Sequence, residues 1–310
     1  QGSAILDSQN LLNLSETAKR QIRGSKIAMI FQEPMTALNP LHRVEKIIGE
    51  SLYLQGWSKD QVRQRVVELL HDVGITHPED KLRRYPHELS GGQRQRVMIA
   101  MALALDPDIL IADEPTTALD VTLQAQILKL LQSLQHRRNM AMILISHDLN
   151  IVKRCAQQVV VMNQGRVEEQ GSAEQIFKQP KAEYTRHLLA HNFGQALPSS
   201  AGSELLRLQQ VSVCFPIRQG LLNRVKDYFV AVEPLNLVLR QGDSIGIVGE
   251  SGSGKTSLAL AIARLIESKG QIFLMEQDLN LLSEKKLRLL RTDFQIVFQD
   301  PFSSLNPRMT

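Results

Sequence analysis

The hydrophobic residues of this chain fall into short apolar runs that alternate with longer stretches of helical spacing. Residues 109–112 and 140–145 are apolar runs of strand length, and each is followed at once by polar residues. Between them, residues 122–137 carry an apolar stripe at Leu123, Ile127, Leu130, Leu131 and Leu134. A strand, a helix and a second strand in this order predict an α/β unit with parallel strands.

Similar patterns extend along the chain in both directions. Helical spacing recurs at residues 11–23 and 41–85, and the second stretch has a stripe of Val62, Val66, Leu69 and Leu70. Further strands are expected at residues 27–31, 158–162, 166–170, 206–215 and 244–248. The second and third of these are expected to form a hairpin around Asn163, Gln164 and Gly165.

Leu89 precedes a sequence with a strong helix-start signal, Ser90, Gly91, Gly92 and Gln93. A serine followed three residues later by glutamine is the pattern of a capping box. The free N–H groups at a helix start bind phosphate well, and glycines let an anion approach the backbone closely. The plainer interpretation is that Ser90 only caps a helix.

Two acidic residues follow the predicted strand at 109–112. Asp113 and Glu114 thus stand at the carboxyl end of a strand, where α/β sheets bind ligands. Asp113 can hold Mg²⁺ through oxygen, and Glu114 can orient or deprotonate a water molecule. His147 follows the neighbouring strand and is expected at the same edge, although a lone histidine is more often structural.

A glycine-rich motif lies between the strand expected at 244–248 and an apolar helix. It consists of Gly249, Glu250, Ser251, Gly252, Ser253, Gly254, Lys255 and Thr256, followed by Ser257. This is a complete P-loop, whose N–H groups face phosphates. Lys255 is expected to reach the β- and γ-phosphate oxygens, and Thr256 to ligate Mg²⁺.

One decapeptide occurs twice in related form. Residues 31–40 read FQEPMTALNP and residues 298–307 read FQDPFSSLNP, with six of the ten positions identical. The two copies, which contain Gln32 and Gln299, stand much farther apart than the 20–50 residues of solenoid repeats. A duplicated domain explains this spacing.

Composition narrows the function classes. The chain has 310 residues, 43% of them hydrophobic, and two cysteines, Cys155 and Cys214, which fit a reducing compartment and exclude a cysteine-only metal centre. Its net charge of +4 is small and few aromatic residues stand near basic ones, so we expect no nucleic-acid partner. No apolar run approaches the roughly 18–20 residues of a membrane-spanning helix.

Together these motifs resemble those of the ABC (ATP-binding cassette) ATPases: residues 89–93 resemble the signature, 109–114 the Walker B strand, and 115–120 the D-loop. The resemblance implies an α/β fold of P-loop NTPase cores, with a mixed sheet flanked by helices and a helical subdomain. It further implies two incomplete copies in tandem. The expected bounds are a first domain at 1–190 with its helical subdomain at about 41–90, a linker at 191–204, and a second domain at 205–310.

The resemblance also assigns roles to individual residues. Glu114 and His147 would be catalytic, with His147 contacting the γ-phosphate through either ring nitrogen, and Gln32 and Gln299 would join the metal and water site. ATP and Mg²⁺ are the implied cofactors, with Thr256 and Asp113 as further metal ligands. The implied nucleotide contacts outside the P-loop are Ser90, Gly91, Gly92, Gln93, Asp120 and an adenine-stacking aromatic, Tyr228 or Phe215.

In this family each nucleotide site pairs the P-loop of one domain with the signature of the other. Lys255 is therefore expected opposite Ser90, and Glu114 and His147 belong to the second site. No P-loop precedes Gln32 and no signature follows Gln299, so the chain is expected to be the middle of a longer tandem ATPase. Two arrangements stay open: a native-like pair of domains, or one cassette in which residues 205–310 complete the sheet of residues 1–190.

The two related decapeptides resemble the Q-loops of peptide and nickel importers. The implied function is ATP hydrolysis that powers import of peptides or peptide-like compounds, microcin C among them. The implied partners are two transmembrane permease subunits and a periplasmic substrate-binding protein, with the chain peripheral to the cytoplasmic face of the inner membrane. The match is partial at Ala182, Glu183 and Tyr184, where that family often has His-Pro-Tyr. The alternatives are a tandem ATPase acting on ribosomes and a purely structural module.

Overall fold

The computed structural model describes residues 2–117, 119–190, 202–219, 224–250 and 252–298. The chain divides into two compact units, Gln1–Asn192 and Phe193–Thr310, which are described separately below. Most of the linker expected at 191–204 and the repeat with Gln299 lie outside the described residues.

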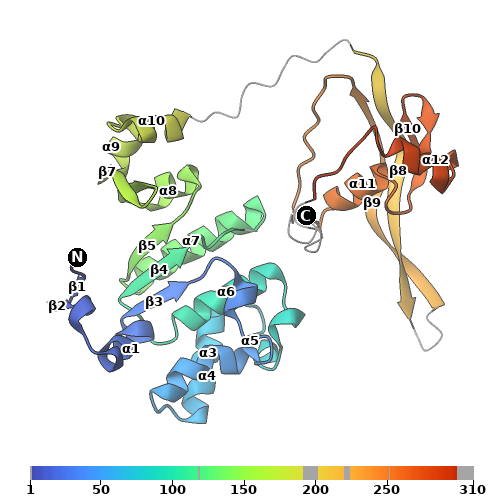
Figure 1. The fold of residues 1–310 in the computed structure, drawn as a ribbon. Helices are drawn as coiled ribbons and strands as arrows, with labels where there is room; N and C mark the ends of the chain where they lie inside the picture. The colour runs from blue at the N-terminus through green and yellow to red at the C-terminus, as the bar shows by residue number, and fades with distance from the viewer. Residues whose placement is uncertain (1, 118, 191–201, 220–223, 251, 299–310) are drawn as a thin grey trace. The chain divides into compact units, whose positions relative to one another are not determined.

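A parallel three-stranded sheet forms the centre of the first unit (Figure 1). Its strands are β3 (Ile27–Ile30), β4 (Ile109–Asp113) and β5 (Ala141–Ile145), in the order β3-β4-β5. The helix α7 (Val121–Arg137) joins β4 to β5, as the apolar stripe predicts. In β4, Leu110 and Ala112 are buried but Ile109 and Ile111 are only partly covered. The apolar run thus forms the expected strand, but only the face with Leu110 and Ala112 is fully buried.

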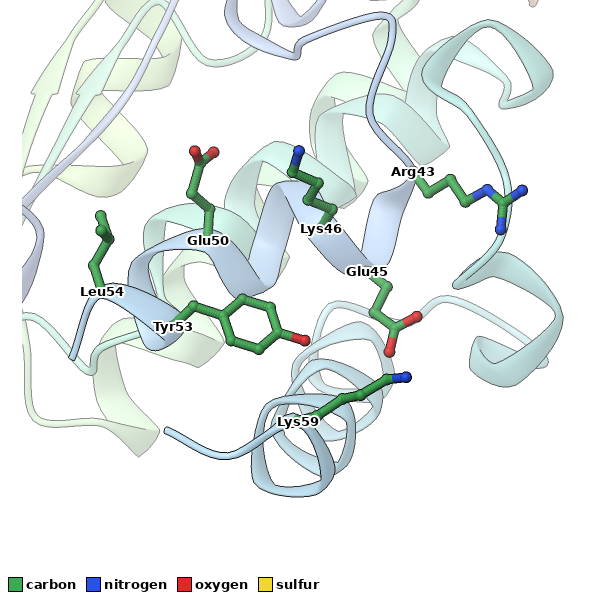
Figure 2. A pocket seen from close by; sticks show the side chains of 7 residues that line it. All are labelled: Arg43, Glu45, Lys46, Glu50, Tyr53, Leu54 and Lys59. Atoms are coloured by element: carbon green, nitrogen blue, oxygen red, sulfur yellow. The ribbon is translucent and has the colours of Figure 1, made fainter. Parts of the chain in front are cut away.

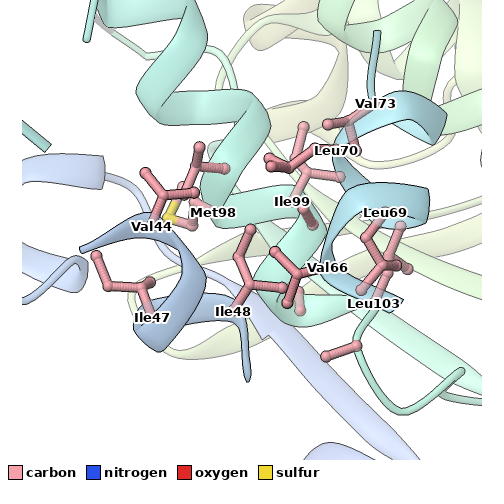
Figure 3. Packing of buried hydrophobic residues seen from close by; sticks show 14 of the residues in the cluster. Val44, Ile47, Ile48, Val66, Leu69, Leu70, Val73, Met98, Ile99 and Leu103 are labelled. Atoms are coloured by element: carbon pink, nitrogen blue, oxygen red, sulfur yellow. The ribbon is translucent and has the colours of Figure 1, made fainter. Parts of the chain in front are cut away.

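The helical stretch expected after residue 41 is confirmed. It contains α3 (Val44–Leu54), α4 (Lys59–Asp72) and α5 (Pro78–Lys81); α2 (Pro34–Ala37) lies before it, and η2 (Pro86–Glu88) and α6 (Gly91–Ala102) follow it. Figure 3 shows α3, α4 and α6 contributing side chains to one apolar core, in which Val66, Leu69 and Leu70 are fully buried. Ser58 and Gln61 form a capping box at the start of α4.

A group of charged residues ties the end of α4 to the end of α7. Arg138 follows α7 and pairs with Asp72 of α4 at 2.6 Å, and it also pairs with Asp106 before β4. Arg65 of α4 reaches Asp106 as well. Arg138 thus bridges two carboxylates from different parts of the chain and holds the helical layer against the sheet layer.

The remaining elements of the first unit are short. The helix expected at 11–23 is replaced by η1 (Leu11–Asn13) and α1 (Glu16–Ser25), because Ser15 caps α1 by accepting from the backbone of Ala18. The expected hairpin is confirmed as β6 (Gln158–Asn163) and β7 (Arg166–Ser172), with left-handed backbone at Gln164 and Gly165. The others are β1 (Ile5–Leu6), β2 (Gln9–Asn10), α8 (Leu149–Cys155), α9 (Ala173–Lys178) and α10 (Glu183–Ala190).

The second unit is built on an antiparallel sheet with the order β11-β10-β8-β9. Two long strands, β8 (Glu204–Gln219) and β9 (Arg224–Arg240), pair along their length, so the strand expected at 206–215 is longer at both ends. The shorter elements are β10 (Lys269–Leu274), β11 (Gln277–Asp278), η3 (Leu279–Leu281), α11 (Lys255–Ile262) and α12 (Glu284–Leu290). Leu258 and Ala261 of α11 are buried against this sheet.

The strand expected at 244–248 is not formed. These residues pair with no described strand, and Val248 is 92% exposed. A strand requires a neighbour to accept and donate its backbone hydrogen bonds, and an apolar run alone does not supply one. The sequence prediction was therefore wrong at this position for a reason that depends on tertiary structure.

Parallel and antiparallel strands occur in separate sheets, so the expected mixed sheet is not found among the described residues. Each described sheet also contains strands from one unit only.

Candidate functional site

Three loops of the first unit converge on the carboxylate of Glu114. Gln32 follows β3, Glu114 follows β4 and His147 follows β5, so all three leave the same edge of the parallel sheet. Gln32 Nε2 donates to Glu114 Oε2 at 2.7 Å, and His147 Nδ1 lies 2.9 Å from Glu114 Oε1. The structure thus brings together three residues that the sequence marked separately.

Sequence reasoning missed a fourth member of this cluster, Thr117. Its Oγ1 donates to Glu114 Oε2 at 2.8 Å, the oxygen that also accepts from Gln32, while His147 contacts Oε1. A threonine three residues after a glutamate in a turn is a signal that could have suggested this contact. The hydrogen bonds from His147, and next from Thr117, lower the pKa of Glu114 below its ordinary value. Glu114 is therefore ionised at neutral pH.

The backbone of Glu114 has an unusual conformation that points its side chain toward these partners. Its φ is 44°, in the left-handed region that residues with a Cβ rarely adopt. The amide of Glu114 donates to the Ile145 carbonyl of β5 at 3.0 Å, and the amide of Thr117 donates to the Glu114 carbonyl at 3.1 Å. A strained backbone held by several contacts is typical of functional positions.

Asp113 is the last residue of β4 and lies level with Ile145 of β5. Among the described residues its carboxylate makes no side-chain hydrogen bond or ion pair. Mg²⁺ is usually held by one or two carboxylates together with water and phosphate oxygens. Asp113 and the amide oxygen of Gln32 fit such a site, since both are oxygen donors at the same sheet edge.

The predicted capping box at the start of α6 is confirmed. Ser90 Oγ accepts from the Gln93 amide at 3.3 Å, and Gln93 Oε1 accepts from the Ser90 amide at 3.2 Å. A Cβ on Gly91 would meet no atom within 4 Å, whereas one on Gly92 would lie 2.9 Å from Leu123 of α7. Gly91 therefore leaves an open approach to the helix start, while Gly92 allows α6 and α7 to pack closely.

Asp120 caps the next helix, α7. Its Oδ1 accepts from the Leu123 amide at 2.9 Å, which orients the loop between β4 and α7. A second residue that sequence reasoning missed, Gln95, also contacts this loop: its Nε2 donates to the Pro115 carbonyl at 2.6 Å. A polar side chain inside an otherwise apolar helix face is the only sequence signal for that contact.

The P-loop of the second unit leads into α11. Gly252 and Gly254 have φ values of 81° and 87°, and a Cβ on Gly254 would collide with the Ala231 carbonyl oxygen. Lys255 Nζ donates to the carbonyl oxygens of Gly249 at 2.8 Å and Glu250 at 2.6 Å, inside the loop. This ammonium stands where a phosphate group would require a cation, and Thr256 is exposed beside it. Ser251 lies outside the described residues.

The two aromatic candidates for adenine stacking lie on opposite faces of the β8–β9 hairpin. Tyr228 pairs with Pro216, and Phe215 pairs with Phe229, at adjacent register positions. Successive residues of a strand point to opposite faces. Tyr228 and Phe215 therefore cannot contact the same ring from one side, and both are substantially exposed.

A groove of about 450 Å³ lies on the helical layer of the first unit. Figure 2 shows Lys46 and Glu50 on one side of α3, and Glu45 and Tyr53 directed toward Lys59 at the start of α4. Arg43 and the exposed Leu54 complete its lining. The groove combines both signs of charge with the apolar surface of Tyr53 and Leu54.

A P-loop at a helix start and an acidic strand edge define a nucleotide-binding protein of the P-loop class. The model of the ABC transporter family matches residues 1–117 and 232–310, which together exceed half of the chain. The chain therefore belongs to the ABC transporter family.

Two groups of relatives are similar along nearly the whole chain. A peptidoglycan transport ATP-binding protein, YejF of Agrobacterium fabrum, is 52% identical over 100% of this chain and 57% of its own length. A glutathione import ATP-binding protein, GsiA of Escherichia coli K12, is 44% identical over 98% of this chain and 54% of its own length. The chain thus spans little more than half the length of these relatives.

Solved structures show the same fold. The ATP-binding cassette MJ0796, in a dimeric post-hydrolysis state bound to ADP and Pi, matches with a TM-score of 0.50 and 29% identity. That match covers 56% of this chain and 74% of the cassette. The protein cbiO1 of Clostridium perfringens, part of the transporter complex cbiONQ, matches with a TM-score of 0.50 and 32% identity over 56% of this chain and 67% of its own.

Proposed function

We propose that this chain is part of an ATP-hydrolysing subunit that powers an ABC importer. The observation that carries the proposal is the hydrogen-bonded cluster of Gln32, Glu114 and His147 at the edge of the parallel sheet. Hydrolysis requires a base beside an attacking water molecule, and an ionised, oriented carboxylate meets that requirement.

The residues of the cluster take distinct roles in this proposal. Glu114 accepts a hydrogen bond from the attacking water and draws away its proton, because its lowered pKa keeps the carboxylate ionised. His147 faces Glu114 through Nδ1, which leaves Nε2 as the nitrogen for a γ-phosphate oxygen. Gln32 now donates its amide to Glu114, so its amide oxygen is the atom available to the metal. Asp113 and Thr256, each in its own site, would hold Mg²⁺, which when bound neutralises phosphate charge.

We further propose two cassettes in tandem with shared sites. In support, the family match falls in two stretches, and the decapeptides with Gln32 and Gln299 are related. Lys255 and the P-loop would then work with the signature residues Ser90 and Gly91 in one site. Glu114 and His147 would work with a second P-loop.

The cargo proposed is a peptide or peptide-like compound. In support, the relatives named above transport peptidoglycan or import glutathione by their names. One assay then compares the uptake of muropeptides, glutathione and microcin C between the wild-type strain and a strain that lacks the gene for this protein. The ribosome-acting alternative is tested by the same strain, through its polysome profile.

The partners proposed are two transmembrane permease subunits and a periplasmic substrate-binding protein, with the chain peripheral to the cytoplasmic face of the inner membrane. In the described residues, no helix combines the length and apolar character needed to cross a bilayer. The groove beside α3 supports a permease contact, since Tyr53 and Leu54 are exposed there. Co-purification with two membrane subunits, lost when Leu54 is replaced by Asp, checks this arrangement.

The test of the activity is Glu114→Gln in the full natural protein. The amide keeps the size of the side chain but cannot take a proton, so we expect kcat to fall by roughly 100-fold or more with ATP affinity kept. Vanadate-sensitive ATP hydrolysis is measured with the partner site disabled. Unchanged turnover in this variant would show that Glu114 is not the base.

A further inference from the structure

A buried polar contact links the helix of the signature motif to the turn that carries Glu114. Gln95 is only 2% exposed, and its Nε2 donates to the Pro115 carbonyl at 2.6 Å. Proline has no amide hydrogen, so this carbonyl is the one backbone hydrogen-bonding group that Pro115 offers. Pro115 directly follows Glu114, and the contact therefore fixes the backbone next to the catalytic carboxylate.

Two further contacts reinforce the link. Thr116 is also buried, and its Oγ1 accepts from Gln124 Nε2 of α7 at 3.3 Å. Gly92 of α6 packs against Leu123 of α7 so closely that a Cβ there would lie 2.9 Å from the leucine side chain. The start of α6, the turn after β4 and the start of α7 thus form one packed body.

The distances along this body are short. Gln95 stands five residues after Ser90, about 7.5 Å along the axis of α6 at the usual rise of 1.5 Å per residue. Well-packed elements move together, because interiors are nearly incompressible. A displacement of Ser90 is therefore passed through α6 to Gln95 and from there to Pro115.

We propose that Gln95 is a positioning residue that couples the two nucleotide sites of the importer ATPase. Ser90 serves one nucleotide site and Glu114 serves the other. The Gln95 contact therefore transmits a displacement of Ser90, caused by nucleotide binding at the first site, to the catalytic carboxylate of the second site. This inference rests on the proposed function. Gln95 touches no reacting atom and acts only through the backbone of Pro115 and Glu114.

The first measurement needs no substitution. Amide hydrogen exchange is followed in the full natural protein with the P-loop of the Glu114 site disabled, with and without a non-hydrolysable ATP analogue, at the start of α6 and at residues 113–117. Coupling predicts that the analogue slows exchange at both places together. Protection of the start of α6 without protection of residues 113–117 would overturn the proposal.

The second measurement uses Gln95→Met, which keeps the length of the side chain and removes the donor. We expect exchange at the Thr117 amide to accelerate even without nucleotide, since that amide closes the turn onto the Glu114 carbonyl at 3.1 Å. We expect kcat to fall roughly 10- to 100-fold with an unchanged KM for ATP, because a misplaced catalytic group costs rate rather than binding.

Ile99→Val is the matched control, because Ile99 is a buried residue of the same helix that faces the apolar core. It should lower stability slightly and leave kcat and the exchange at residues 113–117 as in the wild type. Should Gln95→Met not fold, Gln95→Asn gives the same readouts, since its shorter amide cannot reach Pro115.

The outcomes separate the coupling from the proposed activity. Wild-type kcat and wild-type exchange at residues 113–117 in either Gln95 variant would refute the coupling. Absence of ATP hydrolysis in the wild-type protein would refute the proposed function instead, and the exchange of the nucleotide-free protein would still decide whether Gln95 holds the turn.

Discussion

Replacing Thr117 with valine tests how the ionisation and orientation of Glu114 are set. Thr117 Oγ1 donates to Glu114 Oε2 at 2.8 Å, and valine has nearly the same shape without the donor. The lowered pKa of Glu114 is caused first by the hydrogen bond with His147 and next by that with Thr117. Loss of the Thr117 donor therefore raises the pKa of Glu114 in the variant.

The size of the effect follows from the contacts that remain. A hydrogen bond to a charged group contributes about 1.5–3 kcal/mol net. Gln32 donates to the same oxygen at 2.7 Å and compensates in part, so we expect the lower end, about 1.5 kcal/mol. Loss of this contact also leaves the carboxylate less well oriented toward its water molecule, and we expect kcat to decrease about tenfold.

The sign of the pH dependence also follows. In the proposed role of base, Glu114 accepts a proton only when ionised, so a higher pKa moves the acid limb of the kcat profile to higher pH. The same hydrogen bonds contribute to folding stability above the unfolded pKa of the carboxyl, and this contribution is lost as the pH falls through its folded pKa. The variant loses part of that contribution.

The assay is kcat for ATP hydrolysis at saturating nucleotide, measured across the acid and neutral range. Thr117→Ser keeps the hydroxyl and should behave nearly as the wild type. Thr122→Val makes the same chemical change at an exposed position of α7 and should change nothing. An acid limb and kcat in Thr117→Val equal to those of the wild type would refute the reasoning.

Two further predictions concern binding and stability. Lys255→Ala should abolish nucleotide binding at its own site, because Lys255 is the cation held inside the P-loop. Unchanged ATP affinity in equilibrium titration would contradict this role of Lys255. Arg138→Met should lower the free energy of unfolding by about 1–2 kcal/mol, because Asp72 and Asp106 each lose one of their partners and keep only Arg137 and Arg65, respectively. Arg137→Met is its control in urea denaturation, since the Arg137 contact with Asp72 is longer, 3.5 Å, and more exposed. An equally large decrease in the free energy of unfolding of the control would point to helix propensity instead.

Features that depend on neighbours in sequence were predictable. The capping box of Ser90 and Gln93 formed because its two hydrogen bonds join residues three apart. The β6–β7 hairpin formed because Gln164 and Gly165 can both take positive φ values in a short turn. The stripe of α4 was buried because helical periodicity places Val62, Val66 and Leu69 on one face.

The convergence of Gln32, Glu114 and His147 was predictable for a different reason. Each residue follows a strand of one parallel sheet, and parallel strands end at a common edge. Strand order and direction were thus sufficient to bring the three loops together. They were not sufficient to say which atoms meet, because that depends on side-chain rotamers and on the positive φ of Glu114.

Other features were decided only by the tertiary structure. Residues 244–248 have a strand-like sequence but pair with no described strand, because hydrogen bonds between strands require a partner from elsewhere in the fold. The contacts of Gln95 with Pro115 and of Thr117 with Glu114 depend on how α6 and the turn after β4 pack together. The sequence by itself determined the local elements and the residue types at the sheet edge. The tertiary structure decided the contacts among them, because these join backbone and side-chain atoms whose distance is set by packing rather than by spacing along the chain.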